Sequence, residues 1–156
     1  MDPNFPNGDT GIRAIDDDHH TLARLLLRAG NVCREPPTPD RDCCRCAEDQ
    51  LKACFESLTR FGSDILHLML EHFHGEDVLM NSLPRNRYTK THCDAHRLDH
   101  VNFSTRYNRT VSQFDAHRPA IGLLALNEFV VDWTGSHVLE HDTELGRLLK
   151  LMSPRR

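Results

Sequence analysis

The stretch HCDAHRLDH, residues 92–100, decides the fold because it places three histidines at a strict spacing of four. A helix turns 100° per residue, so His92, His96 and His100 lie along one side of it. Apolar residues continue this stripe at Phe103 and Tyr107. The pattern therefore predicts an amphipathic helix over about residues 91–114.

Three further stretches carry apolar residues in steps of three, four or seven, which predicts helices over about residues 17–31, 47–79 and 119–149. Asp16 to Asp18 suit the N-cap and first turn of the first helix, and Pro119 suits the first turn of the last. Prolines and polar residues predict a loop over about 32–46. No stretch alternates with a period of two. The expected fold is all-α: a single domain over 1–156, an antiparallel up-down-up-down four-helix bundle.

Length and composition limit the classes of function that the chain can have. The 156 residues carry a formal net charge of −4 with mixed signs, which argues against a nucleic-acid or membrane-surface partner. No apolar run approaches the roughly 20 residues of a membrane span, and the first residues lack the features of a signal peptide. We expect a cytoplasmic protein, whose six cysteines are free thiols rather than a disulfide framework.

Histidines and carboxylates interrupt the stripes that should hold Leu, Ile or Phe. A single buried histidine is most often a satisfied core residue, but here they fall on all four predicted helices. Burying an imidazole or a carboxylate costs free energy unless it is hydrogen-bonded or bound to a metal. The sequence therefore predicts a metal centre in the core of the bundle, with candidates His19, His72, Glu76, His96, His100, His137 and Asp142.

Mixed imidazole and carboxylate ligands favour iron, manganese or zinc over copper(I) or an iron–sulfur cluster. The H-E-x-x-H motif of zinc proteases is absent, and the one E-x-x-H motif, Glu71 to His74, is too few for a ferritin-like site. Helical spacing alone leaves open which two of His92, His96 and His100 bind together.

Four motifs, one in each predicted helix and in the same order, resemble those of the bacterial hemerythrins. They are TGIRAIDDDHHTL (10–22), HFHGEDVLM (72–80), AHRLDHVNF (95–103) and WTGSHVLEHD (133–142). The resemblance implies a non-haem di-iron protein, not an enzyme, that binds O2 reversibly at one iron of a carboxylate-bridged and oxo- or hydroxo-bridged pair. Such a protein transports, stores or senses oxygen.

The resemblance also implies a role for each candidate ligand. One iron would be bound by His96, His100 and His137, the other by His19 and His72, and both bridged by Glu76 and Asp142. The oxygen pocket would be lined by Trp133, Thr134 and Val138. In this register His92 is not a ligand. We expect it to be a solvated first-turn residue, and the alternative is a residue that lies against the ligands of the cluster. In the family pattern the bridging carboxylate lies five residues after the last histidine ligand, which corresponds to Asp142 here. Helix geometry alone favours His141, four residues after His137.

Three features depart from the family pattern. Thr134 stands where the family usually carries leucine, which predicts a wetter pocket and faster autoxidation. Asp18 stands where glutamine commonly precedes the first ligand. The long loop after the first helix brings a candidate secondary zinc or thiol–disulfide site, with reduced thiols as the alternative: Cys33, Cys43, Cys46 and Cys54.

Two alternative functions remain open from the sequence. The chain can be a regulatory module whose iron redox state is read by a signalling or redox partner protein. It can also be a di-iron enzyme that handles peroxide or nitric oxide, for which Tyr107 and Thr134 are the candidate proton donors.

Overall fold

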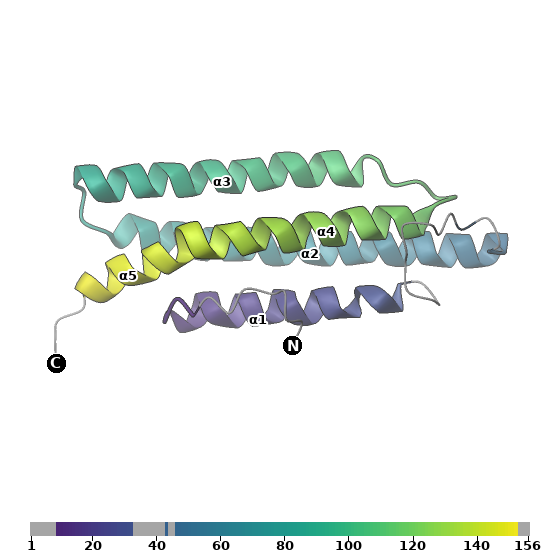
Figure 1. Ribbon diagram of the computed structural model, residues 1–156, viewed down its shortest axis with the longest axis horizontal. Coiled ribbons are helices and arrows are strands. Elements are labelled where there is room, and N and C mark those ends of the chain that lie inside the picture. Colours follow the sequence, from purple (N-terminus) through teal and green to yellow (C-terminus); the bar gives the residue numbers. More distant parts are fainter. Residues whose placement is uncertain (1–8, 33–42, 44–45, 153–156) are drawn as a thin grey trace.

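The structure, a computed structural model, describes residues 9–32, 43 and 46–152. Every regular element within these residues is a helix, and the long helices lie side by side along the long axis of the molecule (Figure 1). The expected all-α helical bundle is confirmed at this level. None of the described helices is long and apolar enough to cross a membrane.

Helix α1 (Arg13–Leu27) is followed by a 3₁₀ turn, η1 (Arg28–Asn31). The predicted start near residue 17 is wrong, because Asp16 lies inside the first turn rather than ahead of it. The Thr10 backbone N–H and hydroxyl each donate to Asp16 Oδ1 at 2.9 Å. Gly11 provides the left-handed turn, with φ of +69°, that lets the chain enter the helix there.

Helices α2 (Glu48–Ser82) and α3 (Arg87–Val111) are close to the predicted ranges but shifted at their ends. α3 begins four residues earlier than predicted because Asn86 and Thr89 form a capping box. The Asn86 side chain accepts from the Thr89 backbone N–H, and the Thr89 hydroxyl accepts from the Asn86 N–H.

The predicted last helix is three consecutive pieces: α4 (Pro119–His137), the π-helical turn η2 (Val138–Asp142) and α5 (Thr143–Met152). Pro119 occupies the first turn of α4, as expected. In η2 the backbone widens, and the Thr143 N–H donates to the carbonyl of Val138, five residues back. Such π turns are rare and occur often at functional sites.

Two apolar clusters fill the core, and a layer of polar side chains separates them. The larger cluster includes Leu22, Met69, Phe73, Phe103 and Trp133. The smaller one consists of Ile15, Met80, Leu83, Cys93, Leu145 and Leu148. In the sequence of each helical segment, the candidate ligands fall between a residue of one cluster and a residue of the other. All four segments therefore bring their polar residues to the same level of the bundle.

Candidate metal centre

Seven buried polar residues make up this layer, which we call the polar belt. Each is at most 8% exposed. α1 contributes one residue, α2 and α3 two each, α4 one and η2 one: His19, His72, Glu76, His96, His100, His137 and Asp142. These are the seven residues predicted from the sequence, and the folded chain brings them together.

Glu76 lies at the middle of one half of the polar belt. Its Oε2 atom is 3.1 Å from His100 Nε2 and 3.3 Å from His96 Nε2. The Nε2 atoms of His72 and His137 are 3.4 and 3.7 Å away. Glu76, His96, His100 and His137 offer ligand atoms that all lie within 4.8 Å of one another, so they can hold one metal ion.

Asp142 joins the other half of the polar belt. Its Oδ2 atom is 2.9 Å from His19 Nε2 and 4.0 Å from His72 Nε2. Its Oδ1 atom is 3.0 Å from His137 Nε2 and 3.3 Å from His96 Nε2. A second possible ligand group consists of His72, Glu76, His137 and Asp142. The two groups share Glu76 and His137.

The π turn explains why Asp142, and not His141, enters the polar belt. In a regular α-helix the residue four positions after His137 returns to the same face. η2 begins directly after His137 and widens the helix by one residue. Asp142, five positions on, is therefore fully buried, whereas His141 is half-buried at the edge of the layer.

Unpartnered buried atoms show that this layer fits a metal. Both Glu76 oxygens, Asp142 Oδ1 and His100 Nε2 are buried and make no hydrogen bond that satisfies them. Native proteins rarely leave such groups unpaired, and burying them so costs free energy. A cation among them would satisfy the carboxylates and imidazoles at once. Nitrogen and oxygen donors of this kind suit iron, manganese or zinc.

Two outer carboxylates orient belt histidines. Asp18 Oδ2 lies 3.3 Å from His72 Nδ1, and Asp99 Oδ2 lies 2.9 Å from His137 Nδ1. A carboxylate only accepts, so each Nδ1 carries the proton and donates it. In the neutral imidazole, Nε2 is then left with its lone pair toward the polar belt. Carboxylate–histidine pairs of this kind typically accompany bound metals.

Aromatic rings hold two belt histidines from the apolar side. Phe73 stacks on His100 with ring centroids 3.9 Å apart, and Trp133 stacks on His137 at 4.1 Å. Both aromatic residues belong to the larger apolar cluster. The two imidazoles are therefore fixed in orientation and shielded from water on that face.

The charges of the polar belt are strongly coupled. Burial raises the pKa of Glu76 and of Asp142, but the surrounding imidazoles, which favour the ionised carboxylates, outweigh it and hold both carboxyl pKa values well below normal. Burial lowers the pKa of His137, but Asp142, Asp99 and Glu76 raise it to about 11. Without a metal, the belt thus favours protons on His72, His96 and His137 and leaves its two carboxylates ionised. A metal ion that binds there must displace such protons.

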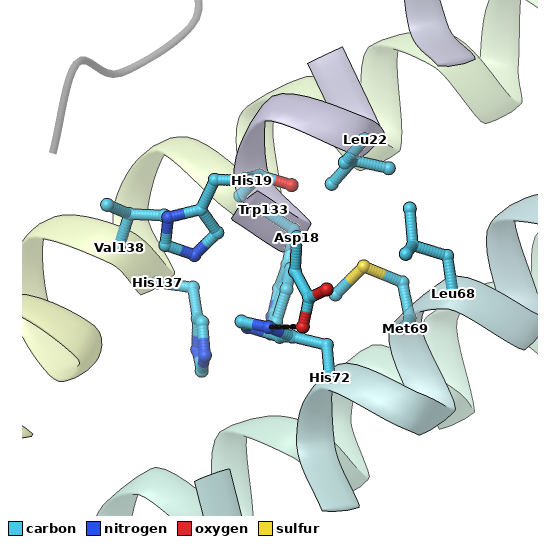
Figure 2. A pocket seen from close by; sticks show the side chains of 10 residues that line it. Asp18, His19, Leu22, Leu68, Met69, His72, Trp133, His137 and Val138 are labelled. Atoms are coloured by element: carbon cyan, nitrogen blue, oxygen red, sulfur yellow. Dashed lines mark hydrogen bonds and ion pairs between the residues drawn. The ribbon is translucent and has the colours of Figure 1, made fainter. Parts of the chain in front are cut away.

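A small cavity opens beside His19 and His72 (Figure 2). Its volume is about 10 Å³, room for roughly one water-sized molecule. The walls are mainly apolar, and the lining includes the three residues predicted for the oxygen pocket: Trp133, Thr134 and Val138. The Thr134 hydroxyl is buried without a partner. Asp18, which is 40% exposed, also lines this cavity.

Asp99 was not among the residues singled out from the sequence. It directly precedes His100, but no spacing connects it with His137, which is 38 positions away. The signal that the sequence offers is its position directly before a predicted ligand. Asp18 departs from the family pattern, and the structure shows that it contacts His72 Nδ1.

The expectation that His92 is a solvated first-turn residue is wrong. α3 begins at Arg87, so His92 lies in its second turn. It is half-buried, its ring packs 5.5 Å from that of His96, and its Nε2 atom is buried without a partner. Tyr107 lies in the larger apolar cluster and is not among the residues that line the cavity.

The cysteine site finds no support in the part of the chain that the structure describes. Cys33 lies outside the described residues. Cys43, Cys46 and Cys54 are free thiols. Within residues 9–32, 43 and 46–152, the groups whose ligand atoms come together contain no cysteine.

No protein-family model, curated protein or solved structure matches the chain. The resemblance to the hemerythrins therefore rests on the four motifs of the sequence.

Proposed function

We propose that this chain is an antiparallel, up-down-up-down four-helix bundle that binds two iron ions in its polar belt and binds O2 reversibly beside them. His96, His100 and His137 would hold one ion, and His19 and His72 the other. Glu76 and Asp142 would bridge both. Iron bound there supplies the redox chemistry that captures and releases dioxygen.

The observation that carries this proposal is the convergence of five imidazole Nε2 atoms on two fully buried carboxylates. Each of the five lies within 4.0 Å of an oxygen of Glu76 or Asp142. A structural core would not leave carboxylate oxygens of this kind unpaired. The number and type of donors match two adjacent ions with nitrogen and oxygen ligands.

The surrounding residues have identifiable tasks in such a centre. Asp18 and Asp99 orient His72 and His137 through their Nδ1 atoms. Trp133 and Phe73 keep water from the stacked imidazole faces. The cavity beside His19 and His72 has the size and apolar walls that suit a small neutral molecule such as O2.

Iron loading followed by oxygen exposure tests the proposal. The protein is loaded anaerobically with Fe²⁺, its iron is counted, and its absorption is followed on exposure to air and again after oxygen is removed. Two irons per chain and a spectral change that reverses without oxygen support reversible binding. Rapid irreversible oxidation favours the sensor reading, in which a partner protein reads the redox state. A protein that retains no iron overturns the proposal.

A second candidate, an enzyme that consumes peroxide or nitric oxide, is favoured by Asp18. Its carboxyl group lines the cavity and is also accessible to solvent, so it can relay protons from solvent to a ligand in the cavity. The test is steady-state turnover of hydrogen peroxide or nitric oxide by the iron-loaded protein. Turnover that is lost in Asp18→Asn would support the enzyme function over reversible oxygen binding.

A further inference from the structure

A third group of possible metal ligands lies on the solvent side of the polar belt. Asp99, His137 and His141 offer ligand atoms that all lie within 4.8 Å of one another. Unlike the belt groups, this one contains two half-buried members, Asp99 and His141. It therefore connects solvent with His137, which is 1% exposed.

The π turn creates this group. Because Asp142 takes the inward position, His141 is displaced to the edge of the belt, where its ring stacks on that of His96 at 5.0 Å. Its ring lies 5.3 Å from that of His137 and 6.3 Å from that of His92. His92 Nε2 is buried without a partner, so this side chain also has a donor atom that nothing in the described chain uses.

Asp99 has a free oxygen for a ligand. Its Oδ2 atom accepts from His137 Nδ1 at 2.9 Å. A carboxylate has a second oxygen with its own lone pairs, and the Asp99 side chain is 26% exposed. One carboxylate and one or two half-buried imidazoles are donors that a divalent transition-metal ion prefers.

We propose that Asp99 and His141, with His92 beside them, form an outer site for a divalent transition-metal ion on its way into the polar belt. The proposal rests on the proposed function, since it assumes that the belt is filled with metal. An ion bound at this outer site is next to the rings of His96 and His137, both belt ligands. Exchanging water for these ligands one at a time avoids stripping the ion of all its water in a single step.

The cavity beside His72 is a less suitable entrance for a hydrated cation. Its walls are mainly apolar, including Leu22, Leu68 and Met69, and Asp18 is its one carboxylate (Figure 2). Desolvating a divalent ion against such walls is costly. The two approaches to the belt therefore differ in chemistry: the cavity suits a small neutral ligand, and the outer site suits a cation.

Uptake of Co²⁺ by the metal-free protein tests the outer site, because Co²⁺ accepts the same donor types and its absorption reports on its ligands. Equilibrium titration gives the number of ions, and stopped-flow absorption gives the rate at which the belt fills. We expect two tightly bound ions and a third, weaker one. His141→Ala should lose the third ion, keep the first two, and fill the belt about tenfold more slowly.

His74→Ala is the matched control, since His74 is exposed on α2 and lies outside every ligand group. It should fill the belt at the wild-type rate. His92→Ala serves as a second variant if His141→Ala does not fold by circular dichroism, and it should also slow filling. Wild-type rates and stoichiometry in both variants would overturn the outer site while leaving the belt intact. A wild-type protein that binds only the weaker ion would instead overturn the proposed function and keep the outer site.

Discussion

Thr134 offers a direct test of the cavity, because its buried hydroxyl has no hydrogen-bond partner and its side chain is 2% exposed. A buried, unsatisfied polar group costs about 1–3 kcal/mol. Valine has the same shape without the hydroxyl, and its helix propensity is close to that of threonine. Thr134→Val should therefore raise the free energy of unfolding by about 1–3 kcal/mol. The Tm should rise by about 2–4 °C for each kcal/mol gained.

Urea and thermal unfolding of the metal-free protein measure this effect. Thr105→Val is the matched control, because the exposed Thr105 hydroxyl donates to the Val101 carbonyl at 2.9 Å and is satisfied. Thr105→Val should give no comparable rise in the free energy of unfolding. If Thr134→Val is instead less stable than the wild type, the hydroxyl has a partner in solution and the argument about the cavity fails.

The same substitution bears on oxygen chemistry if the proposed function is right. A hydroxyl on the cavity wall lowers the cost of admitting water, and water beside bound iron would speed autoxidation. Autoxidation of the oxygenated protein should be slower in Thr134→Val, and also in Thr134→Leu, than in the wild type. An unchanged autoxidation rate in both variants would refute the role given to Thr134.

Three further predictions concern the polar belt. Asp99→Ala should weaken Co²⁺ binding by about 10- to 100-fold at an unchanged helical content, with Asp99→Asn closer to the wild type, as measured by equilibrium titration. His92→Ala should retain two irons per chain in elemental analysis, whereas His96→Ala should not, and the opposite result would shift the ligand register by one turn. In the metal-free protein His137 has its pKa raised from 6.5 to about 11, so its stabilising effect is complete below pH 6.5 and is lost as the pH rises toward 11. The free energy of unfolding should fall across that window in urea titrations, and the fall should be smaller in His137→Gln.

Much of the candidate site could be predicted from local sequence. The apolar spacing and the polar interruptions place each ligand on a helix face, because side chains three or four residues apart share that face. The same logic failed at the helix ends. The first helix begins at Arg13 because Thr10 binds Asp16, and α3 begins at Arg87 because Asn86 and Thr89 form a capping box.

Spacing alone could not choose between His141 and Asp142. A regular helix would turn His141 inward, and only the motif resemblance favoured Asp142. The structure supplies the physical reason, since the π turn adds one residue to the helix between His137 and its carboxylate. The displaced His141 then lies near Asp99, where we propose the outer site, and the spacing of the sequence does not predict this placement.

The sequence by itself determined that four amphipathic segments bury histidines and carboxylates, because each segment's pattern depends only on its own helical period. Contacts between segments depend on packing and could not be read from any one of them. Only the tertiary structure pairs Asp99 of α3 with His137 of α4, and Asp18 of α1 with His72 of α2. It also places His92 against His96 and His141 rather than in solvent, because the start of α3 fixes which turn His92 occupies.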